Sequence, residues 1–196
     1  MMDRKGLLLV LVDPAPTLEE ELNDWYDNEH LPERRALPGF ETARRYTSLG
    51  DGPRYAAIYD LASLEVLQSE AYRAVSGANV SPWTRRVTSR AHPLRITARQ
   101  VYPGDRPTGL CARLLLLRFR AIAEDELPAL AEGLKYGLAS CPGLLQLRVF
   151  SCEEPDRSSA IAIAEFGGIA APVNMAEVGA GAGKIDLAAT YRPYGA

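Results

Sequence analysis

The sequence has few of the residues that build metal and redox centres. It contains two histidines and three cysteines in 196 residues, and the cysteines form no C-x-x-C pair. Two imidazoles cannot make a three-histidine site, and the cysteine spacing indicates neither a zinc ribbon nor a disulfide framework. We therefore expect no metal ion, and we interpret Cys111, Cys141 and Cys152 as small core residues.

Long apolar runs and an excess of basic charge are also absent. The run at residues 6–12 is too short for a transmembrane span or for the apolar part of a secretion signal. Lys and Arg number 22 against 25 Asp and Glu, which gives a net charge of −3. Because nucleic-acid binding needs a basic face, we expect a cytoplasmic protein with neither a nucleic-acid nor a membrane partner. The hydrophobic content of 47% is enough to bury a real core.

The first half of the chain has an element pattern of β-α-β-β-α-β. In order, we expect a strand at 6–12, a helix from Thr17 to the Pro38-Gly39 turn, strands at 41–48 and 54–61, a helix from Ser63 to Gly77, a loop with Pro82 and Trp83, and a strand at 95–102. This order is typical of the ferredoxin-like split βαβ unit, in which helices cover one face of an antiparallel sheet.

The second half repeats this plan weakly. Strands are expected at 112–119 and 159–166, a helix carries its apolar stripe at 127–138, and Pro142-Gly143 matches the first Pro-Gly turn. The second helix of this copy, around 173–178, is short and poor.

We therefore place two ferredoxin-like βαββαβ repeats at 1–104 and 105–196. Their strands are apolar on both faces, so the bare faces of the two sheets should pack together. The predicted fold class is α+β, with the two repeats forming a pseudo-dimeric α+β barrel within one chain. Whether two such chains form a homodimer is left open.

One acid/base group is expected on the first helix. Helical spacing places Glu29 within the inward apolar stripe, with Tyr26 and His30 one turn apart at its edge. A partly buried carboxylate, an imidazole and a phenol can together move protons. The alternative is that Glu29 and His30 satisfy backbone groups freed where Pro32 interrupts the helix. In the second copy the matching positions carry Leu130 for Tyr26, Gly133 for Glu29 and Leu134 for His30, so any site belongs to the first half.

Other residues are candidates for binding a small molecule. Trp83, with Arg85 and Arg86 beside it, can cover a pocket mouth and hold an anionic substrate, although a surface loop with two solvated arginines explains them equally well. Tyrosines that can line the pocket, or simply pack in the core, are Tyr46, Tyr55, Tyr59 and Tyr72. The glycine-rich run at 179–184 lacks the spacing of a phosphate-binding loop, so no nucleotide cofactor is expected.

A tryptophan, a histidine a few residues later and a Pro-Gly turn occur in order at 25–32 (WYDNEHLP) and 37–40 (LPGF). Together with 43–46 (ARRY) and 53–61 (PRYAAIYDL), this pattern resembles the signature of EthD-like proteins in the dimeric α+β barrel superfamily. The likeness covers the first half well and the second half only in outline. It implies a pocket between helix and sheet, and His30 matches the pocket histidine that moves protons in some isomerases and cyclases of the superfamily.

The first functional hypothesis is a cofactor-independent enzyme of small-molecule or secondary metabolism. It would act as a cyclase, isomerase or monooxygenase on an aromatic, polyketide-like or lactone substrate. His30 would be the general base or acid, Glu29 its partner and Tyr26 a donor to an enolate oxygen. The substrate-binding residues would be Trp25, Tyr46, Tyr59, Trp83 and Arg85. The second hypothesis is a non-catalytic, small-molecule-binding or stress-associated module, and the third is a structural partner in a larger assembly.

Overall fold

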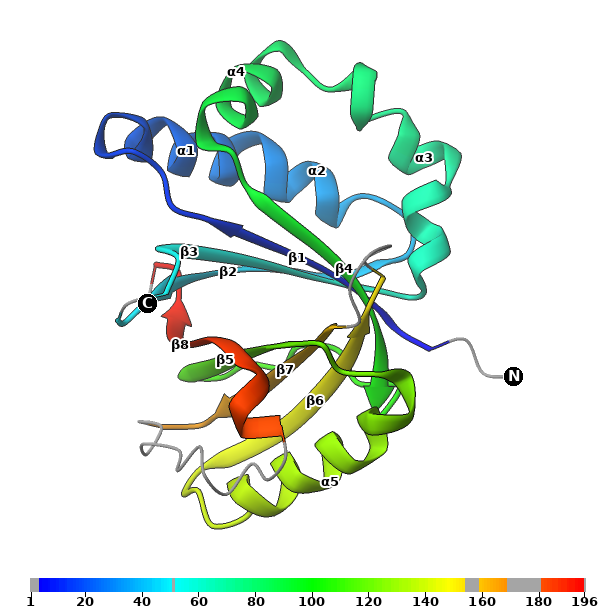
Figure 1. Ribbon diagram of the computed structural model, residues 1–196. Helices are drawn as coiled ribbons and strands as arrows, with labels where there is room; N and C mark the ends of the chain where they lie inside the picture. Colours follow the sequence, from blue (N-terminus) through cyan, green and yellow to red (C-terminus); the bar gives the residue numbers. More distant parts are fainter. Residues whose placement is uncertain (1–3, 51, 154–158, 169–180, 196) are drawn as a thin grey trace.

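The structure is a computed structural model that describes residues 4–50, 52–153, 159–168 and 181–195 (Figure 1). The strands within these residues form one closed barrel in the order β1-β3-β2-β8-β5-β7-β6-β4, and every neighbouring pair is antiparallel. The strands are β1 (Gly6–Val12), β2 (Phe40–Ser48), β3 (Tyr55–Leu61), β4 (Leu94–Tyr102), β5 (Arg113–Arg120), β6 (Leu144–Cys152), β7 (Ser159–Phe166) and β8 (Ile185–Pro193). The predicted α+β barrel is confirmed.

The barrel closes within the single chain. Its first half is β1 to β4 and its second half is β5 to β8, and each half has the same internal order of strands. The halves join where β2 pairs with β8, with Tyr46 opposite Pro193, and where β4 pairs with β6, with Ala98 opposite Cys152. The predicted boundary at residues 104 and 105 falls in the connection between β4 and β5. The helix expected around 173–178 lies outside the described residues.

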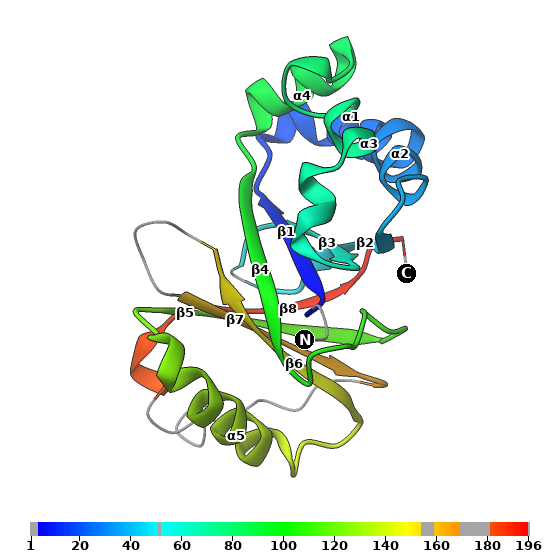
Figure 2. The ribbon, with the colours of Figure 1, turned by 90° about the vertical axis from the view of Figure 1, so that its right-hand side faces the viewer.

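The central strands of each half, β1, β3, β5 and β7, bury most of both faces. One face points into the barrel, where the two halves share a core that includes Leu9, Ile58, Leu116 and Ile163. The other face packs beneath helices, and Figures 1 and 2 show α1 to α4 on one outer side of the barrel and α5 (Leu127–Leu138) on the opposite side. This explains why these central strands are largely apolar on both faces rather than alternating.

The first helical segment runs through Pro32 instead of ending there. It consists of the turn η1 (Pro16–Leu18), α1 (Glu19–Trp25), a π-helical turn η2 (Tyr26–His30) and α2 (Leu31–Arg35). Pro32 occupies the first turn of α2, where its missing N–H matters least. A π-turn is a local widening that often marks a functional site. Here it carries both Tyr26 and His30.

The second helical region differs from the prediction. A single helix from Ser63 to Gly77 is not formed, and the chain instead makes η3 (Leu64–Gln68), α3 (Glu70–Arg73) and η4 (Gly77–Asn79). The loop expected around Trp83 is a helix, α4 (Pro82–Ala91). The prediction was wrong here because α4 has a sparse apolar stripe, with only Thr84, Val87 and Ala91 buried.

A helix-start signal was nonetheless present in the sequence. The Ser81 side chain caps α4 by accepting a hydrogen bond from the backbone N–H of Thr84 at 2.9 Å, and Pro82 fills the first helical position. Neither α4 nor any other helix in the described residues has the length and apolar character needed to cross a bilayer.

Candidate functional site

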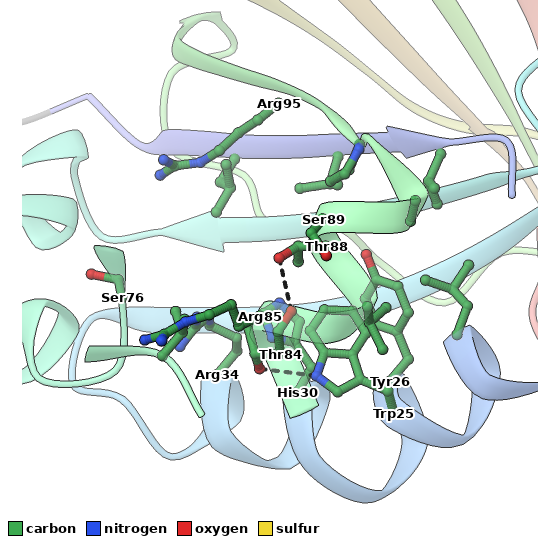
Figure 3. A pocket seen from close by; sticks show the side chains of 18 of the residues that line it. Trp25, Tyr26, His30, Arg34, Ser76, Thr84, Arg85, Thr88, Ser89 and Arg95 are labelled. Atoms are coloured by element: carbon green, nitrogen blue, oxygen red, sulfur yellow. Dashed lines mark hydrogen bonds between the residues drawn. The ribbon is translucent and has the colours of Figure 1, made fainter. Parts of the chain in front are cut away.

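A cavity of about 470 Å³ lies between the first half's helices and the outer face of its sheet (Figure 3). Strand β1 supplies its apolar floor through Leu8, Val10 and Val12, and α1 and α4 supply Leu22 and Val87. This volume falls within the range of small-molecule binding sites. The predicted pocket between helix and sheet is therefore present in the structure.

Four aromatic rings gather at one end of the cavity. His30 stacks on Trp25 with ring centroids 4.2 Å apart and an interplanar angle of 30°. The edges of Tyr26 and Tyr59 meet the imidazole at centroid distances of 5.4 Å and 6.2 Å. All four residues line the cavity. Because α1, the π-turn and β3 carry them, their positions are set by regular structure rather than by a loop.

His30 is held as a neutral imidazole. Its pKa is lowered to about 3, chiefly by burial and to a smaller extent by the positive charges of Arg34 and Arg45. Its Nδ1 atom is buried and has no hydrogen-bond partner among the described residues. A buried polar atom without a partner costs free energy unless a ligand or water satisfies it. Nδ1 is therefore the clearest polar attachment point at the aromatic end.

The two tyrosines beside His30 keep their protons. Burial raises the pKa of Tyr26 to about 12, although the Arg45 guanidinium 4.2 Å from its ring centroid opposes this. Burial also raises the pKa of Tyr59 well above its usual value. The Tyr59 hydroxyl is buried without a hydrogen-bond partner in the described part of the chain. Both phenols can therefore donate hydrogen bonds to a ligand oxygen.

The Glu29 carboxylate accepts hydrogen bonds from Trp25 on its own helical segment and from two residues at the start of α4. Within the described residues no hydrogen bond joins Glu29 to His30. Its Oε1 atom accepts from the indole of Trp25 at 3.2 Å, from Ser81 at 2.5 Å and from Thr84 at 2.9 Å. The Thr84 hydroxyl also accepts from Trp25 at 3.0 Å. This network connects the π-turn to the start of α4. The structure thus places Glu29 behind the aromatic wall, where it positions Trp25.

The predicted binding residues divide into two groups. Trp25, Tyr59 and Arg85 line the cavity. Tyr46 does not reach it, because Tyr46 faces the barrel interior, and Trp83 packs against the outer core without lining the cavity. Alternation along β2 accounts for Tyr46, since neighbouring strand residues point to opposite faces.

Two arginines that line the cavity were not among the predicted site residues. Arg34 follows His30 by four residues on the same helical face and is 4% exposed. Arg95 comes from the beginning of β4. The helical spacing of Arg34 was a usable signal in the sequence, whereas Arg95 required the barrel to bring β4 beside β1.

The described residues of the second half hold no equivalent group. Leu130 and Leu134 of α5, which correspond to Tyr26 and His30, are buried in the hydrophobic core of the second half. Among the described residues there is also no cluster of three or more His, Cys, Asp or Glu side chains able to hold a metal ion.

The buried imidazole predicts a pH-dependent stability. The pKa of His30 is about 3 in the folded protein and 6.5 as its ordinary value, so between them the unfolded chain binds the additional proton. The free energy of unfolding therefore falls by about 1.4 kcal/mol per pH unit as the pH drops below the ordinary pKa of histidine. Above that pKa, His30 makes no contribution to the pH dependence. In His30→Asn we expect this part of the slope to disappear, as measured by urea unfolding at steps between neutral pH and about pH 5.

His92→Asn is the matched control. His92 is exposed at the end of α4 with φ at 45°, a backbone conformation that asparagine tolerates. This variant should keep the slope of the natural protein. Equal slopes in the natural protein and in His30→Asn would contradict the buried, neutral state of His30.

Comparison with known proteins identifies the fold. No family model matches the chain, and no curated protein matches it. Among solved structures, an anthrone oxidase-like protein has a TM-score of 0.69 and 13% identity, covering 97% of this chain and 91% of that one. A putative monooxygenase from Lactobacillus acidophilus NCFM has a TM-score of 0.56 and 11% identity, covering 97% and 93%.

Chlorite dismutase from Candidatus Nitrospira defluvii is a third similar structure. A single-substitution mutant of that enzyme has a TM-score of 0.57 and 10% identity, covering 98% of this chain and 93% of that one. The similar structures are dimeric α+β barrel proteins, and at these identities the likeness shows the fold alone. The finer resemblance to EthD-like proteins stays a prediction.

Proposed function

We propose that this protein is a cofactor-independent enzyme that moves protons on a planar, aromatic or polyketide-like small molecule. The observation that carries the proposal is the unpartnered Nδ1 atom of His30 beside a cavity whose aromatic end also holds the protonated hydroxyls of Tyr26 and Tyr59. A base next to two hydrogen-bond donors is the arrangement that enolate formation requires.

The chemistry is a proton transfer and its return. His30 accepts a proton from an acidic C–H of the substrate, and the electron pair left on carbon delocalises onto a carbonyl oxygen. Tyr26 or Tyr59 donates a hydrogen bond to that oxygen. For an isomerisation the imidazolium returns the proton to another carbon of the substrate. For a cyclisation the carbanion first attacks a second carbonyl carbon of the same molecule, and the imidazolium protonates the alkoxide oxygen formed with the new C–C bond. Where dioxygen is the second reactant, the carbanion adds to it and the imidazolium protonates the resulting peroxide anion. Loss of water, with the remaining hydrogen of the same carbon, then leaves a carbonyl that retains one oxygen atom.

The low pKa of His30 sets a condition on the substrate. A base with a pKa of about 3 is weak unless the anion that it creates stays beside it. Opposite charges about 4 Å apart attract by about 4 kcal/mol at an effective dielectric constant of about 20. Since about 1.4 kcal/mol corresponds to one unit of pKa, the ion pair brings the pKa of His30 back toward neutrality. Arg34 and Arg45, whose positive charges oppose protonation of His30, also stabilise the substrate anion.

The comparisons support this class of reaction. Two of the similar structures are described as an anthrone oxidase-like protein and a putative monooxygenase, so the same fold carries proteins named for oxidation of small molecules.

One observation favours a second candidate, a binding protein without catalysis. Glu29 is engaged by Trp25, Ser81 and Thr84, so no carboxylate in the described residues orients the imidazole. A neutral, unprotonated His30 then serves only as a hydrogen-bonding group for the ligand.

Anaerobic hydrogen–deuterium exchange at the acidic carbon of anthrone distinguishes the enzyme from the non-catalytic binding protein. We expect the protein to accelerate exchange over buffer, as followed by NMR, and His30→Asn to lose about a hundredfold or more of that acceleration, the contribution typical of a general base. Excluding oxygen confines the measurement to the proton step.

His92→Asn should retain full acceleration, which controls for the loss of an imidazole elsewhere in the chain. If the natural protein does not accelerate exchange, or if His30→Asn accelerates it equally, the enzymatic proposal fails.

A further inference from the structure

The end of the cavity away from the aromatic rings is basic. Arg34, Arg85 and Arg95 all line the cavity, and none of the described lining residues is Asp or Glu. In Figure 3 their guanidinium groups lie on the side opposite the rings of Trp25 and Tyr26. The chain as a whole carries a net charge of −3, so this local excess of positive charge runs against the sign of the protein.

Tyr72 joins two of these arginines. The Cζ atoms of Arg34 and Arg95 lie 5.3 Å and 5.9 Å from the centroid of its ring, and Nη2 of Arg95 donates a hydrogen bond to its hydroxyl at 3.0 Å. Arg34 already pairs with Glu33, at 2.9 Å, and donates to the backbone carbonyl of Val75. Arg34 is therefore a fixed charge in the wall, while Arg95 keeps free donors.

Arg85 completes the basic end from α4. Its Nη2 atom donates to the backbone carbonyl of Ala78 at 3.2 Å, which turns the side chain toward the segment after α3. Within the described residues neither Arg85 nor Arg95 forms an ion pair. The other two arginines of α4, Arg86 and Arg90, both form ion pairs with Glu21.

We propose that Arg85 and Arg95 bind a carboxylate of the substrate, while its planar rings lie against Trp25 and His30. The inference deepens the proposed function, on which it rests, by naming the substrate as an aromatic carboxylic acid. A guanidinium presents paired N–H donors that match the two oxygens of a carboxylate, and such charge-assisted bonds are the strong ones. The Tyr72 hydroxyl adds a polar neighbour, and the buried charge of Arg34 adds attraction that solvent screens little.

The geometry also sets the orientation of the ligand. With the carboxylate at the basic end, the opposite end of a planar molecule reaches the group formed by Tyr26, His30 and Tyr59. Recognition and chemistry thus occupy different ends of one cavity. A substrate without the acid would lose this contact and bind more weakly.

A matched pair of ligands tests the proposal by isothermal titration calorimetry. We expect anthraquinone-2-carboxylate to bind about tenfold or more tightly than anthraquinone-2-carboxamide, which has nearly the same shape and no charge. Arg95→Gln and Arg85→Gln should each lower the affinity for the acid about tenfold and leave that for the amide unchanged. Raising the salt concentration should weaken the binding of the acid and leave the binding of the amide unchanged.

Arg86→Gln and Arg90→Gln are the control variants, since both remove an arginine from α4 outside the cavity. They should bind the acid as the natural protein does. Equal affinities for acid and amide, or equal losses in the control variants, overturn the carboxylate site whatever the exchange assay shows. A preserved preference for the acid without accelerated exchange refutes only the enzymatic proposal. Failure of both ligands to bind overturns the carboxylate site, and the exchange assay then decides the enzymatic proposal by itself.

Discussion

Residues 1–104 and 105–196, expressed as separate chains, are expected not to fold as native monomers. Each half contributes strand edges that pair with the other half, β2 with β8 and β4 with β6. Each half also contributes to the core inside the barrel. Its buried members are Leu7, Leu9, Leu11, Tyr46, Ala56, Ile58, Ile96 and Ala98 from the first half and Leu114, Leu116, Phe150, Ile161, Ile163, Ala189 and Tyr191 from the second.

An isolated half would expose that whole apolar face and two unpaired strand edges. Both features drive association of chains. We therefore expect the separate halves to lack native near-ultraviolet circular dichroism as monomers, and the mixed halves to recover it in a one-to-one complex. Light scattering coupled to size-exclusion chromatography measures the stoichiometry. A monomeric 1–104 chain with the native spectrum would show that the halves are independent domains.

The second large effect is expected at Arg148. This arginine is fully buried in β6, and its guanidinium donates to Asp60 of the first half at 2.6 Å, to Glu165 at 3.1 Å and to the Thr108 hydroxyl at 2.7 Å. The two carboxylates are also satisfied by backbone N–H groups, those of Thr108 and Gly109. The cluster therefore connects β3 of the first half with β6 and β7 of the second.

Arg148→Ala should lower the free energy of unfolding by about 3–5 kcal/mol, because it leaves Asp60 and Glu165 buried without a counter-charge. Urea unfolding measures the loss. This expectation holds whether or not the cluster of Arg148, Asp60 and Glu165 stabilises the folded protein as a whole. Removing all three charges together, in Arg148→Met with Asp60→Asn and Glu165→Gln, should cost less than removing the arginine alone.

Arg99→Ala is the matched comparison. Arg99 also pairs with two glutamates, Glu65 at 3.1 Å and Glu153 at 2.8 Å, but its side chain is 38% exposed. Solvent screens such pairs, so the loss should stay at about 1 kcal/mol or less. Similar losses in Arg148→Ala and Arg99→Ala would mean that the buried cluster does not hold the halves together.

The local elements could largely be predicted from the chain itself. Short apolar runs bounded by glycine and proline identify strands such as 6–12, and helical spacing brings Trp25, Tyr26 and His30 to the inner side of one helix. The same spacing predicts the apolar filling at Leu130 and Leu134. The helix α4 could not be identified from its periodicity, because arginine and threonine occupy half of it and only the Ser81-Pro82 start signals it.

The partners of individual polar groups were beyond the reach of local patterns. Glu29 lies on the predicted inner side, yet its carboxylate bonds to Ser81 and Thr84, which are more than fifty residues away. Tyr46 could not be separated from Tyr59 by residue type, and only the pleat of the closed sheet sends one into the barrel and the other toward the cavity.

The amino-acid sequence alone determines the order of elements, the apolar strands that demand a sheet covered on both sides, and the position of the imidazole on its helix. Only the tertiary structure decides that His30 is neutral, that Arg34, Arg85 and Arg95 share one end of a cavity, and that Arg148 finds carboxylates from both halves. The physical reason is that periodicity and turn signals act between neighbours along the chain. Burial and charge instead depend on which distant segments the barrel brings together.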